Sequence, residues 1–272
     1  MNEQPASILD QVLKAWENVL AGNNLTYGLP RDISTDGAGI DHLFYTLHYF
    51  MLALFIGWGI YLVYCLIKFR ERPGHVADVS VKHFSLPKYL EFGIVIFEAS
   101  LLIFFSYPIW AKVKRDFPNE KDALVVHVVA EQFAWNVHYP GKDGIFGKGD
   151  ISLMDGTNPL GLNREEADAK DDIVSPNNLV VPVGKPVIVH LRSKDVIHSF
   201  FLLEARVKQD AIPGMEIPLW FNTQEAGNFE ISCAQLCGVG HAKMRGFFKV
   251  LPQEEYDKWL AEEQAAVLES GA

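Results

Sequence analysis

Asp, Glu, Lys and Arg are absent from residues 42–67, a run of 26 residues. About 20 apolar residues in a helix cross the hydrocarbon core of a bilayer, so this run is long enough to span a membrane with some tilt. A second apolar run at 89–111 contains two acids, Glu91 and Glu98. The alternative for each run is a buried helix in a soluble core. Two such runs joined by a short loop predict a transmembrane helix hairpin over 42–112.

Positive charge is concentrated between the two runs. Five lysines and arginines lie within residues 68–88, whereas only two precede residue 42. The positive-inside rule therefore predicts a cytoplasmic loop at 70–88, between helices at 42–69 and 89–112. Both termini then face the opposite side of the membrane.

Residues 1–41 are predicted to form a segment on the outer surface. The start of the chain has neither the basic residues nor the apolar stretch of a signal peptide. Apolar residues at helical spacing predict an amphipathic helix there: Ile8, Leu9, Val12, Trp16, Val19 and Leu20. A helix that packs against a neighbouring subunit fits the same pattern.

A different pattern begins after residue 112. Seven short runs rich in Val, Ile and Phe lie within residues 120–252, separated by Gly, Pro, Asn and Asp. This spacing predicts a Greek-key sandwich or barrel. Residues 158–172 are rich in charge and predict a solvated loop, and 253–272 reads as a polar terminal helix or tail. The fold class is therefore an α+β membrane protein, with a helix hairpin followed by an all-β domain.

Composition excludes several classes of protein. The chain is 49% hydrophobic and 21% charged, which is not the composition of a disordered protein. Its net charge of -10, with no basic stripe, argues against nucleic acid as a partner. Three cysteines are too few for a disulfide scaffold. The positive mean hydropathy of +0.07 is explained by the hairpin.

The densest group of potential metal ligands lies in the string CAQLCGVGHAKM near the C-terminus. Gly238 and Gly240 interrupt any helix there, so the string predicts a loop between two strands. A further histidine begins an earlier β-type run in the string DVIHSF. Thiolates, imidazoles and a thioether form a soft donor set that favours copper: His198, Cys233, Cys237, His241 and Met244.

Four kinds of site are compatible with these donors. The first is a disulfide between Cys233 and Cys237. The second is a zinc ion bound by two Cys and two His, which leaves Met244 unused. A mononuclear blue-copper site uses only one cysteine. A pair of copper ions bridged by both thiolates uses every donor, since each ion then has one imidazole and one weak axial ligand.

The pattern C-x3-C-x3-H-x2-M, together with DVIHSF and VKQDAIPG, resembles subunit II of cytochrome c oxidase. The resemblance covers almost the whole chain. It implies a cupredoxin-like domain at 120–252 that carries the dinuclear CuA centre. It also implies a function: CuA accepts electrons from cytochrome c and passes them to the haem centres of subunit I. In that family subunit I reduces oxygen to water and the oxidase pumps protons.

The same resemblance assigns a role to each ligand. Cys233 and Cys237 bridge the two copper ions, and His198 and His241 bind one ion each. Met244 is one weak axial ligand, and the backbone carbonyl of Gln235 is the other. The family usually has Glu at the position of Gln235, where the side chain also contacts a magnesium ion at the boundary with subunit I. A neutral amide is a poorer ligand for that hard cation.

Three further residues have family counterparts. The family's aromatic stretch is close to QWYW, and its first tryptophan takes up electrons. The matching stretch here is EQFAW, so Phe133 and Trp135 are the candidates for electron uptake. Ordinary core aromatics are the alternative for both. Glu91 matches an acid at the mouth of a proton-uptake channel, and Glu98 lies seven residues further on nearly the same helical face.

The acidic surplus suggests a basic electron donor. Acids in two places are expected to attract a basic cytochrome c and to raise the encounter rate at low salt: Glu165, Glu166, Asp168, Asp171, Asp172 and Asp195. A merely solvated loop is the alternative for the first five.

The resemblance implies a multi-pass protein of the bacterial inner membrane, with its copper domain and both termini on the periplasmic side. The expected partners are subunit I, other oxidase subunits, cytochrome c and membrane lipid. One alternative is the subunit II of a quinol oxidase, which has no need of the copper ligands. Another is a membrane-anchored copper carrier. Acids within a span, and a hairpin where one helix would serve as an anchor, count against the carrier.

Overall fold

The computed structural model describes residues 29–74, 76, 80 and 85–270. The amphipathic helix predicted near the N-terminus lies outside these residues, as does part of the predicted cytoplasmic loop.

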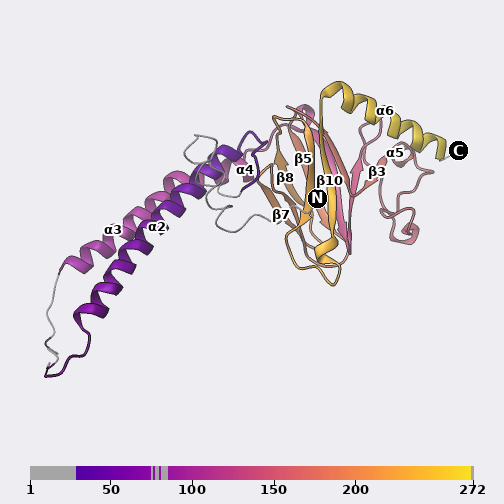
Figure 1. Cartoon of the computed structure of the whole chain (residues 1–272). Helices are drawn as coiled ribbons and strands as arrows, with labels where there is room; N and C mark the ends of the chain where they lie inside the picture. Colours follow the sequence, from indigo (N-terminus) through magenta and orange to yellow (C-terminus); the bar gives the residue numbers. More distant parts are fainter. Residues whose placement is uncertain (1–28, 75, 77–79, 81–84, 271–272) are drawn as a thin grey trace, which may run out of the picture. The chain divides into compact units, whose positions relative to one another are not determined.

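Two long apolar helical segments lie side by side (Figure 1), where the rings of Phe50 and Phe97 are 4.6 Å apart. In the most apolar stretch of the first segment 0% of the residues are buried within the protein, and in that of the second 6% are buried. No soluble core therefore covers these helices. Both segments are long and apolar enough to cross a membrane. The first is α2 (Gly37–Lys68), and the second is a continuous run of α3 (Leu86–Leu101), a π-helical turn η1 (Leu102–Ser106) and α4 (Tyr107–Lys114).

The π-helical turn ends at Ser106, two residues before Pro108. Proline has no N–H to donate to the carbonyl four residues earlier, and its ring crowds that carbonyl. A single wider turn at this point keeps the helix continuous past the proline, which is how π-helical segments commonly occur.

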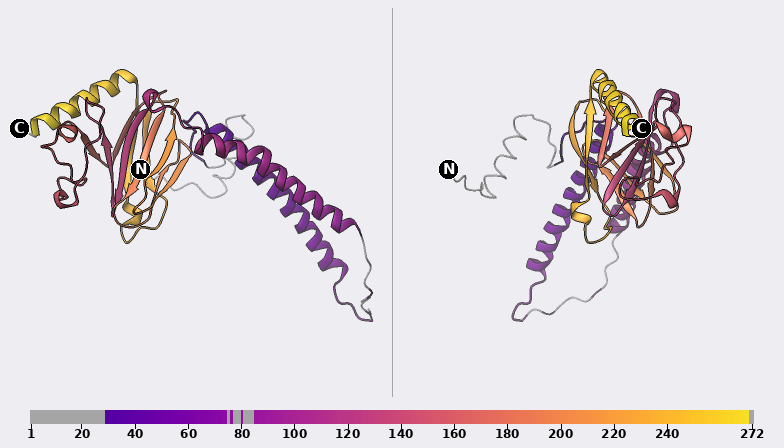
Figure 2. Two further views of the ribbon diagram at one scale, coloured as in Figure 1. Left: turned by 180° about the vertical axis from the view of Figure 1, so that it is seen from behind. Right: turned by 90° about the vertical axis from the view of Figure 1, so that its right-hand side faces the viewer.

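The rest of the chain forms two five-stranded sheets, which Figures 1 and 2 show from three sides. The first sheet has the order β3-β2-β1-β5-β8, and the second has the order β4-β10-β9-β6-β7. The strands are β1 (Leu124–Glu131), β2 (Ala134–Tyr139), β3 (Ile173–Pro176), β4 (Asn178–Pro182), β5 (Val187–Ser193), β6 (His198–Leu202), β7 (Val207–Ala211), β8 (Ile217–Phe221), β9 (Gly227–Cys233) and β10 (Arg245–Leu251). Short helical segments lie between them: η2 (Glu120–Asp122), η3 (Ile151–Leu153), α5 (Ala167–Lys170) and η4 (His241–Lys243).

The hydrophobic core lies between the two sheets. Along β1, Val126, Val128 and Ala130 are fully buried and alternate with less buried residues, the period of two that a half-buried strand requires. From the second sheet, Phe200 and Phe248 are among the largest wholly buried side chains. The predicted hairpin followed by an all-β domain is therefore confirmed.

The strand count differs from the seven predicted runs. One long apolar run contains both β1 and β2, which are joined by a tight turn at Gln132 and Phe133. The short strands β3 and β7 were not predicted. β7 has three consecutive polar residues, Lys208 to Asp210, and it pairs only with β6 at the edge of its sheet.

A C-terminal helix, α6 (Gln253–Ser270), adds apolar side chains to the core. Trp259, Leu260 and Val267 pack against the core cluster, and the Trp259 ring lies 5.2 Å from the Tyr139 ring. The Tyr139 hydroxyl donates to the carbonyl oxygen of Val180 and accepts from its N–H, which joins β2 to β4 across the two sheets.

A bidentate ion pair connects α2 to the β-domain. Arg206 Nε and Nη2 donate to the two carboxylate oxygens of Asp41 at 2.8 and 2.9 Å. Both side chains are largely buried, with 6% and 17% of their surface exposed. Loss of one partner from such a pair leaves an uncompensated charge in a poorly solvated place, so the bond ties the first helix firmly to the β6–β7 turn.

Three histidines form a row across the outer face of the first sheet. His127 on β1 lies directly opposite His138 on β2 and His190 on β5. The ring of Phe146, from the loop after β2, stacks on His127 at 3.8 Å. Burial lowers the pKa of His127 to about 4, and the two neighbouring histidines add to this effect. His127 is therefore neutral at physiological pH.

This row makes the stability of the fold depend on pH. Below its ordinary pKa of 6.5, His127 is protonated in the unfolded chain but stays neutral in the folded chain until about pH 4. Stability from this residue is thus fully present above that ordinary pKa and is lost as the pH falls through this window. We expect His127→Gln to lose less stability than the wild type on acidification, as measured by thermal unfolding of the full chain in detergent. Equal losses in both proteins would contradict the assignment.

Candidate metal centre

Pairing of β6 with β9 brings the first two potential ligands together. Phe200 on β6 is in register with Cys233, the last residue of β9. His198, two residues before Phe200, points to the same side of β6 and is wholly buried. The Ala234 N–H then donates to the Ser199 carbonyl at 2.9 Å, which holds the start of the following loop beside β6.

The loop between β9 and β10 delivers the other three ligands. Cys237 lies in the loop, His241 begins the single turn η4, and Met244 immediately precedes β10. Backbone bonds fold the loop on itself, with the N–H groups of His241 and Met244 donating to the carbonyls of Gly238 and His241. All five predicted side-chain ligands therefore gather at one end of the sandwich.

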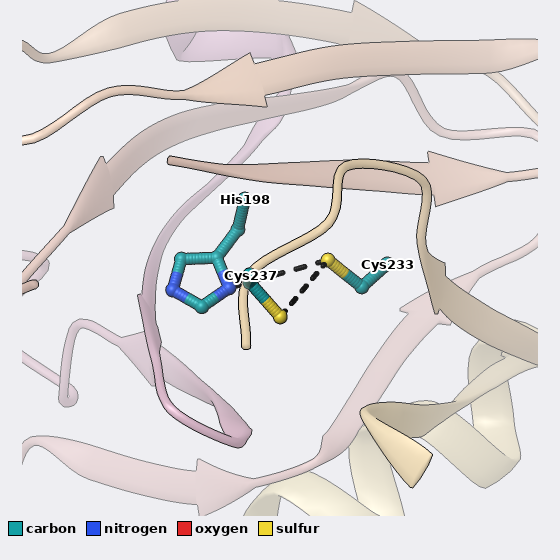
Figure 3. Close-up of side chains that lie close together, drawn as sticks. All are labelled: His198, Cys233 and Cys237. Atoms are coloured by element: carbon teal, nitrogen blue, oxygen red, sulfur yellow. Dashed lines mark hydrogen bonds between the residues drawn. The ribbon is translucent and has the colours of Figure 1, made fainter. Parts of the chain in front are cut away.

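The donor atoms are close enough to share metal ions. The Sγ atoms of Cys233 and Cys237 are 3.8 Å apart, and both cysteines are free thiols, not a disulfide. His198 Nδ1 lies 4.0 Å from Cys233 Sγ and 3.1 Å from Met244 Sδ. Ligand atoms of His198, Cys233 and Cys237 all lie within 4.8 Å of one another. Figure 3 shows these three side chains converging.

The remaining two ligands adjoin Cys237. Its Sγ is 3.6 Å from His241 Nδ1 and 3.6 Å from Met244 Sδ. The two histidines thus approach the thiol pair at different sulfurs, His198 beside Cys233 and His241 beside Cys237. The carbonyl oxygen of Gln235 lies 3.2 Å from Cys233 Sγ, and the side chain of Gln235 is exposed.

Burial makes the Cys237 thiol harder to ionise. Burial, together with the nearby Cys233, raises the pKa of the Cys237 thiol to about 11. The thiol therefore stays protonated at neutral pH unless a metal ion lies beside it, because a coordinated thiol is deprotonated by the charge of the ion. The site fits a soft metal: it offers two thiols, two imidazoles and a thioether, and three of these five side chains are buried.

Asp195 orients the most deeply buried imidazole. Its Oδ1 lies 2.8 Å from His198 Nε2, so the other ring nitrogen, Nδ1, faces the sulfur atoms. Burial by itself would raise the pKa of Asp195, but hydrogen bonds from His198 and from the N–H groups of Gln132 and Val196 lower it below its usual value. A carboxylate behind a histidine is a common support for a metal ligand.

Two glycines allow an aromatic ring to lie on the ligand loop. A Cβ at Gly240 would be 2.4 Å from the ring of Phe133, and a Cβ at Gly238 would be 3.2 Å from it. Gly238 also has a φ of +140°, which side chains rarely adopt. The turn between β1 and β2 therefore covers this part of the loop.

The two aromatic candidates occupy different environments. Trp135 is wholly buried, and its ring centroid lies 6.1 Å from that of His198. Phe133 is half-buried against the loop glycines. Trp135 therefore contacts a ligand from inside the domain, whereas Phe133 lies between the ligand loop and the surface.

The acidic loop lies away from the metal centre. β2 begins beside the ligand loop and ends at Tyr139, which pairs with Ile173 directly after these acids. The five intervening residue steps correspond to roughly 17 Å. Asp172 is also wrongly predicted as a surface charge, because it is completely buried. Its carboxylate lies 2.6 Å from His138 Nε2 and accepts from the N–H groups of Gly141 and Gly147.

Within the membrane segments, Glu91 lies on α3 and lines a groove between α2 and α3 together with Trp58 and Tyr61. Glu98 is exposed one heptad further along. Neither acid is part of the metal centre.

Sequence reasoning missed two supporting residues. Asp195 was considered only as a surface charge, although an acid three residues before a buried histidine in a turn is a usable signal. Gln132 gave no signal, because its contacts depend on how the β1–β2 turn approaches a loop about a hundred residues further along the chain, with Cys237 at a separation of 105.

Comparison with known proteins places the β-domain in one family. A family model described as the periplasmic domain of cytochrome c oxidase subunit II matches residues 124–250. The alternative cytochrome c oxidase subunit 2 of Bradyrhizobium diazoefficiens is 34% identical over 206 residues, covering 75% of this chain and 73% of that protein. Cytochrome c oxidase subunit 2 of Synechocystis is 28% identical over 259 residues, covering 90% and 78%. The solved periplasmic domain of subunit II of the cytochrome oxidase of Bradyrhizobium japonicum is 29% identical, with a TM-score of 0.41, and covers 55% of this chain and 98% of that one.

The contact between Phe133 and Gly240 can be tested by adding a side-chain atom at residue 240, where the ring leaves no room for one. Gly240 has a φ of -93°, which alanine adopts readily, so only the contact with the ring opposes Gly240→Ala. We expect a loss of about 1–3 kcal/mol in the free energy of unfolding. Adding Phe133→Ala should recover part of this loss in a double-mutant cycle measured by thermal unfolding. Gly156→Ala is the control, since a Cβ there meets nothing within 4 Å. Additive effects of Gly240→Ala and Phe133→Ala would contradict the contact.

Proposed function

The chain belongs to the cytochrome c oxidase subunit II family, and from that premise we propose that it is the electron-accepting subunit of a proton-pumping oxidase. It accepts electrons from a cytochrome c and passes them to the haem centres of subunit I, where oxygen is reduced to water. One observation carries this proposal: five soft donors, one from β6 and four from the stretch between the end of β9 and the start of β10, lie within 4 Å of a neighbouring donor, and three of them are buried.

We assign two copper ions to this pocket. Cys233 and Cys237 would be shared by both ions, His198 and His241 would each hold one ion, and Met244 and the Gln235 carbonyl would supply the weaker contacts. A copper pair that shares its charge across two thiolates accepts and releases a single electron with little rearrangement. The donor set favours this assignment over zinc, because Met244 is buried with its sulfur 3.6 Å from Cys237 Sγ and zinc makes little use of a thioether.

The protein holds its ligands in one arrangement. Asp195 keeps the Nδ1 atom of His198 turned toward the sulfurs, at 4.0 Å from Cys233 Sγ. Trp135 lies edge-on to the His198 ring and fills the space behind it. Water is excluded on this side, since both residues are wholly buried.

Electrons are taken up on the side of the β1–β2 turn. Phe133 is the aromatic residue that reaches from the ligand loop toward the surface, and Trp135 continues the aromatic path inside to His198. Attraction of a basic donor by Glu165, Glu166 and Asp168 acts at long range, because these exposed acids lie at the far end of β2.

The two apolar helices anchor the chain in a bacterial inner membrane and contact subunit I, other oxidase subunits and lipid. The excess of basic residues in 68–88 supports a cytoplasmic loop, with both termini and the copper domain in the periplasm. Glu91, toward the cytoplasmic end of α3, delivers protons to a channel of subunit I. A magnesium contact at Gln235 is weakened by the amide, although the side chain is exposed.

Copper content and spectroscopy of the full chain in detergent test the metal assignment. We expect two copper ions per chain and a mixed-valence signal in which one unpaired electron couples to both nuclei. Cys237→Ser should abolish this signal and the rapid uptake of electrons from reduced cytochrome c, whereas Met244→Leu should keep both ions and alter the signal. Met215→Leu is the matched control, because Met215 is 53% exposed and lies outside the ligand loop. A single copper ion, or a zinc ion, in the wild type would overturn the assignment.

A further inference from the structure

Gln132 contacts both halves of the metal centre from the turn between β1 and β2. Its backbone N–H donates to Asp195 Oδ2 at 2.7 Å, and its side-chain Nε2 donates to the Cys237 carbonyl at 2.6 Å. The two acceptors lie in separate parts of the chain, one before β6 and the other in the loop after β9.

The first contact reaches an imidazole ligand. Asp195 accepts from Gln132 with one carboxylate oxygen, while its other oxygen lies 2.8 Å from His198 Nε2. Because both oxygens are engaged, the carboxylate has little freedom to rotate. The backbone of Gln132 therefore fixes the group that orients His198.

The second contact reaches a thiol ligand. A bond to the Cys237 carbonyl restrains the backbone of the residue whose sulfur lies within 4 Å of Cys233, His241 and Met244. A Cβ at residue 238 would be 2.6 Å from Gln132 Nε2, so the glycine there lets the amide reach the carbonyl. Gln132 itself is exposed, so a core-packing role does not account for these contacts.

We propose that Gln132 is a positioning residue of the metal centre, which holds the His198 and Cys237 sides in register through one hydrogen bond to each. The inference rests on the proposed function for the identity of the metal. It concerns a side chain that touches no metal ion and acts only through Asp195 and Cys237.

Gln132→Met separates the two contacts, because methionine has nearly the same length and keeps the backbone N–H but cannot donate to the Cys237 carbonyl. In the full chain in detergent, we expect a loss of copper affinity of about 10-fold or more, as is usual when a supporting hydrogen bond is removed. The positive end of the amide N–H dipole also favours the more reduced ions, so the midpoint potential should fall. Gln132→Glu places a negative oxygen against the carbonyl and should shift both quantities in the same direction.

The measurements are competition with a copper chelator, a redox titration of the copper signal, and thermal unfolding of the metal-free chain. Gln253→Met is the matched control, since Gln253 begins α6 and its side chain donates to Asp257 of the same helix. Unchanged affinity and potential in both Gln132 variants would overturn the proposal. The proposal would also be overturned if the variants unfolded at a lower temperature without metal and this loss of stability accounted for the whole change in copper affinity.

The stoichiometry of the wild type and the behaviour of the variants answer different questions. If the wild-type chain binds a number of copper ions other than two, the proposed function is contradicted. The ratio of wild-type to variant affinity for copper tests Gln132 whatever that number is, so either idea can fail while the other stands.

Discussion

Antiparallel pairing of β6 with β9 is the contact on which the metal centre depends. With Phe200 opposite Cys233, a histidine two residues earlier on β6 and a cysteine at the end of β9 face the same interior. The loop that follows β9 must then turn back to enter β10, and that return carries Cys237, His241 and Met244 past the same point. A shift of one residue in this pairing would turn His198 out of the interior, because side chains alternate between the faces of a strand.

Burial at this point sets the chemistry. His198, Met244 and Cys237 are all buried. Burial raises the pKa of the Cys237 thiol, so this thiol stays protonated in the absence of a cation. Neighbouring groups then restrict how the ligands move: Asp195 behind His198, the Phe133 ring on the loop glycines, and Gln132 between the two sides. These restraints on the ligands are what the proposed role in electron transfer requires, because a centre that moves little can gain and lose an electron quickly.

Acidic side chains serve two different purposes. Asp172 in the β-domain is completely buried and Asp41 on α2 is largely buried, and each accepts from specific donors, the first from His138 and two glycine N–H groups and the second from Arg206. Glu165, Glu166 and Asp168 remain exposed and contribute to the net charge of -10. A count of acids does not separate these groups, since the same residue type is internal in one place and solvated in the other.

The sequence alone determined the helix hairpin and the all-β domain after it, and it singled out the five candidate side-chain ligands that the fold brings together. These features rest on local signals: a long run without charge, alternation of apolar residues along strands, and soft donors at short spacing. Only the tertiary structure decided the rest. It placed β3 and β7 in the sheets although their sequences are short or polar, buried Asp172 and Trp135, and brought the Gln132 turn against a loop that follows about a hundred residues later. Such contacts depend on how strands pair and sheets pack. The residues next to Gln132 in the sequence therefore do not predict them.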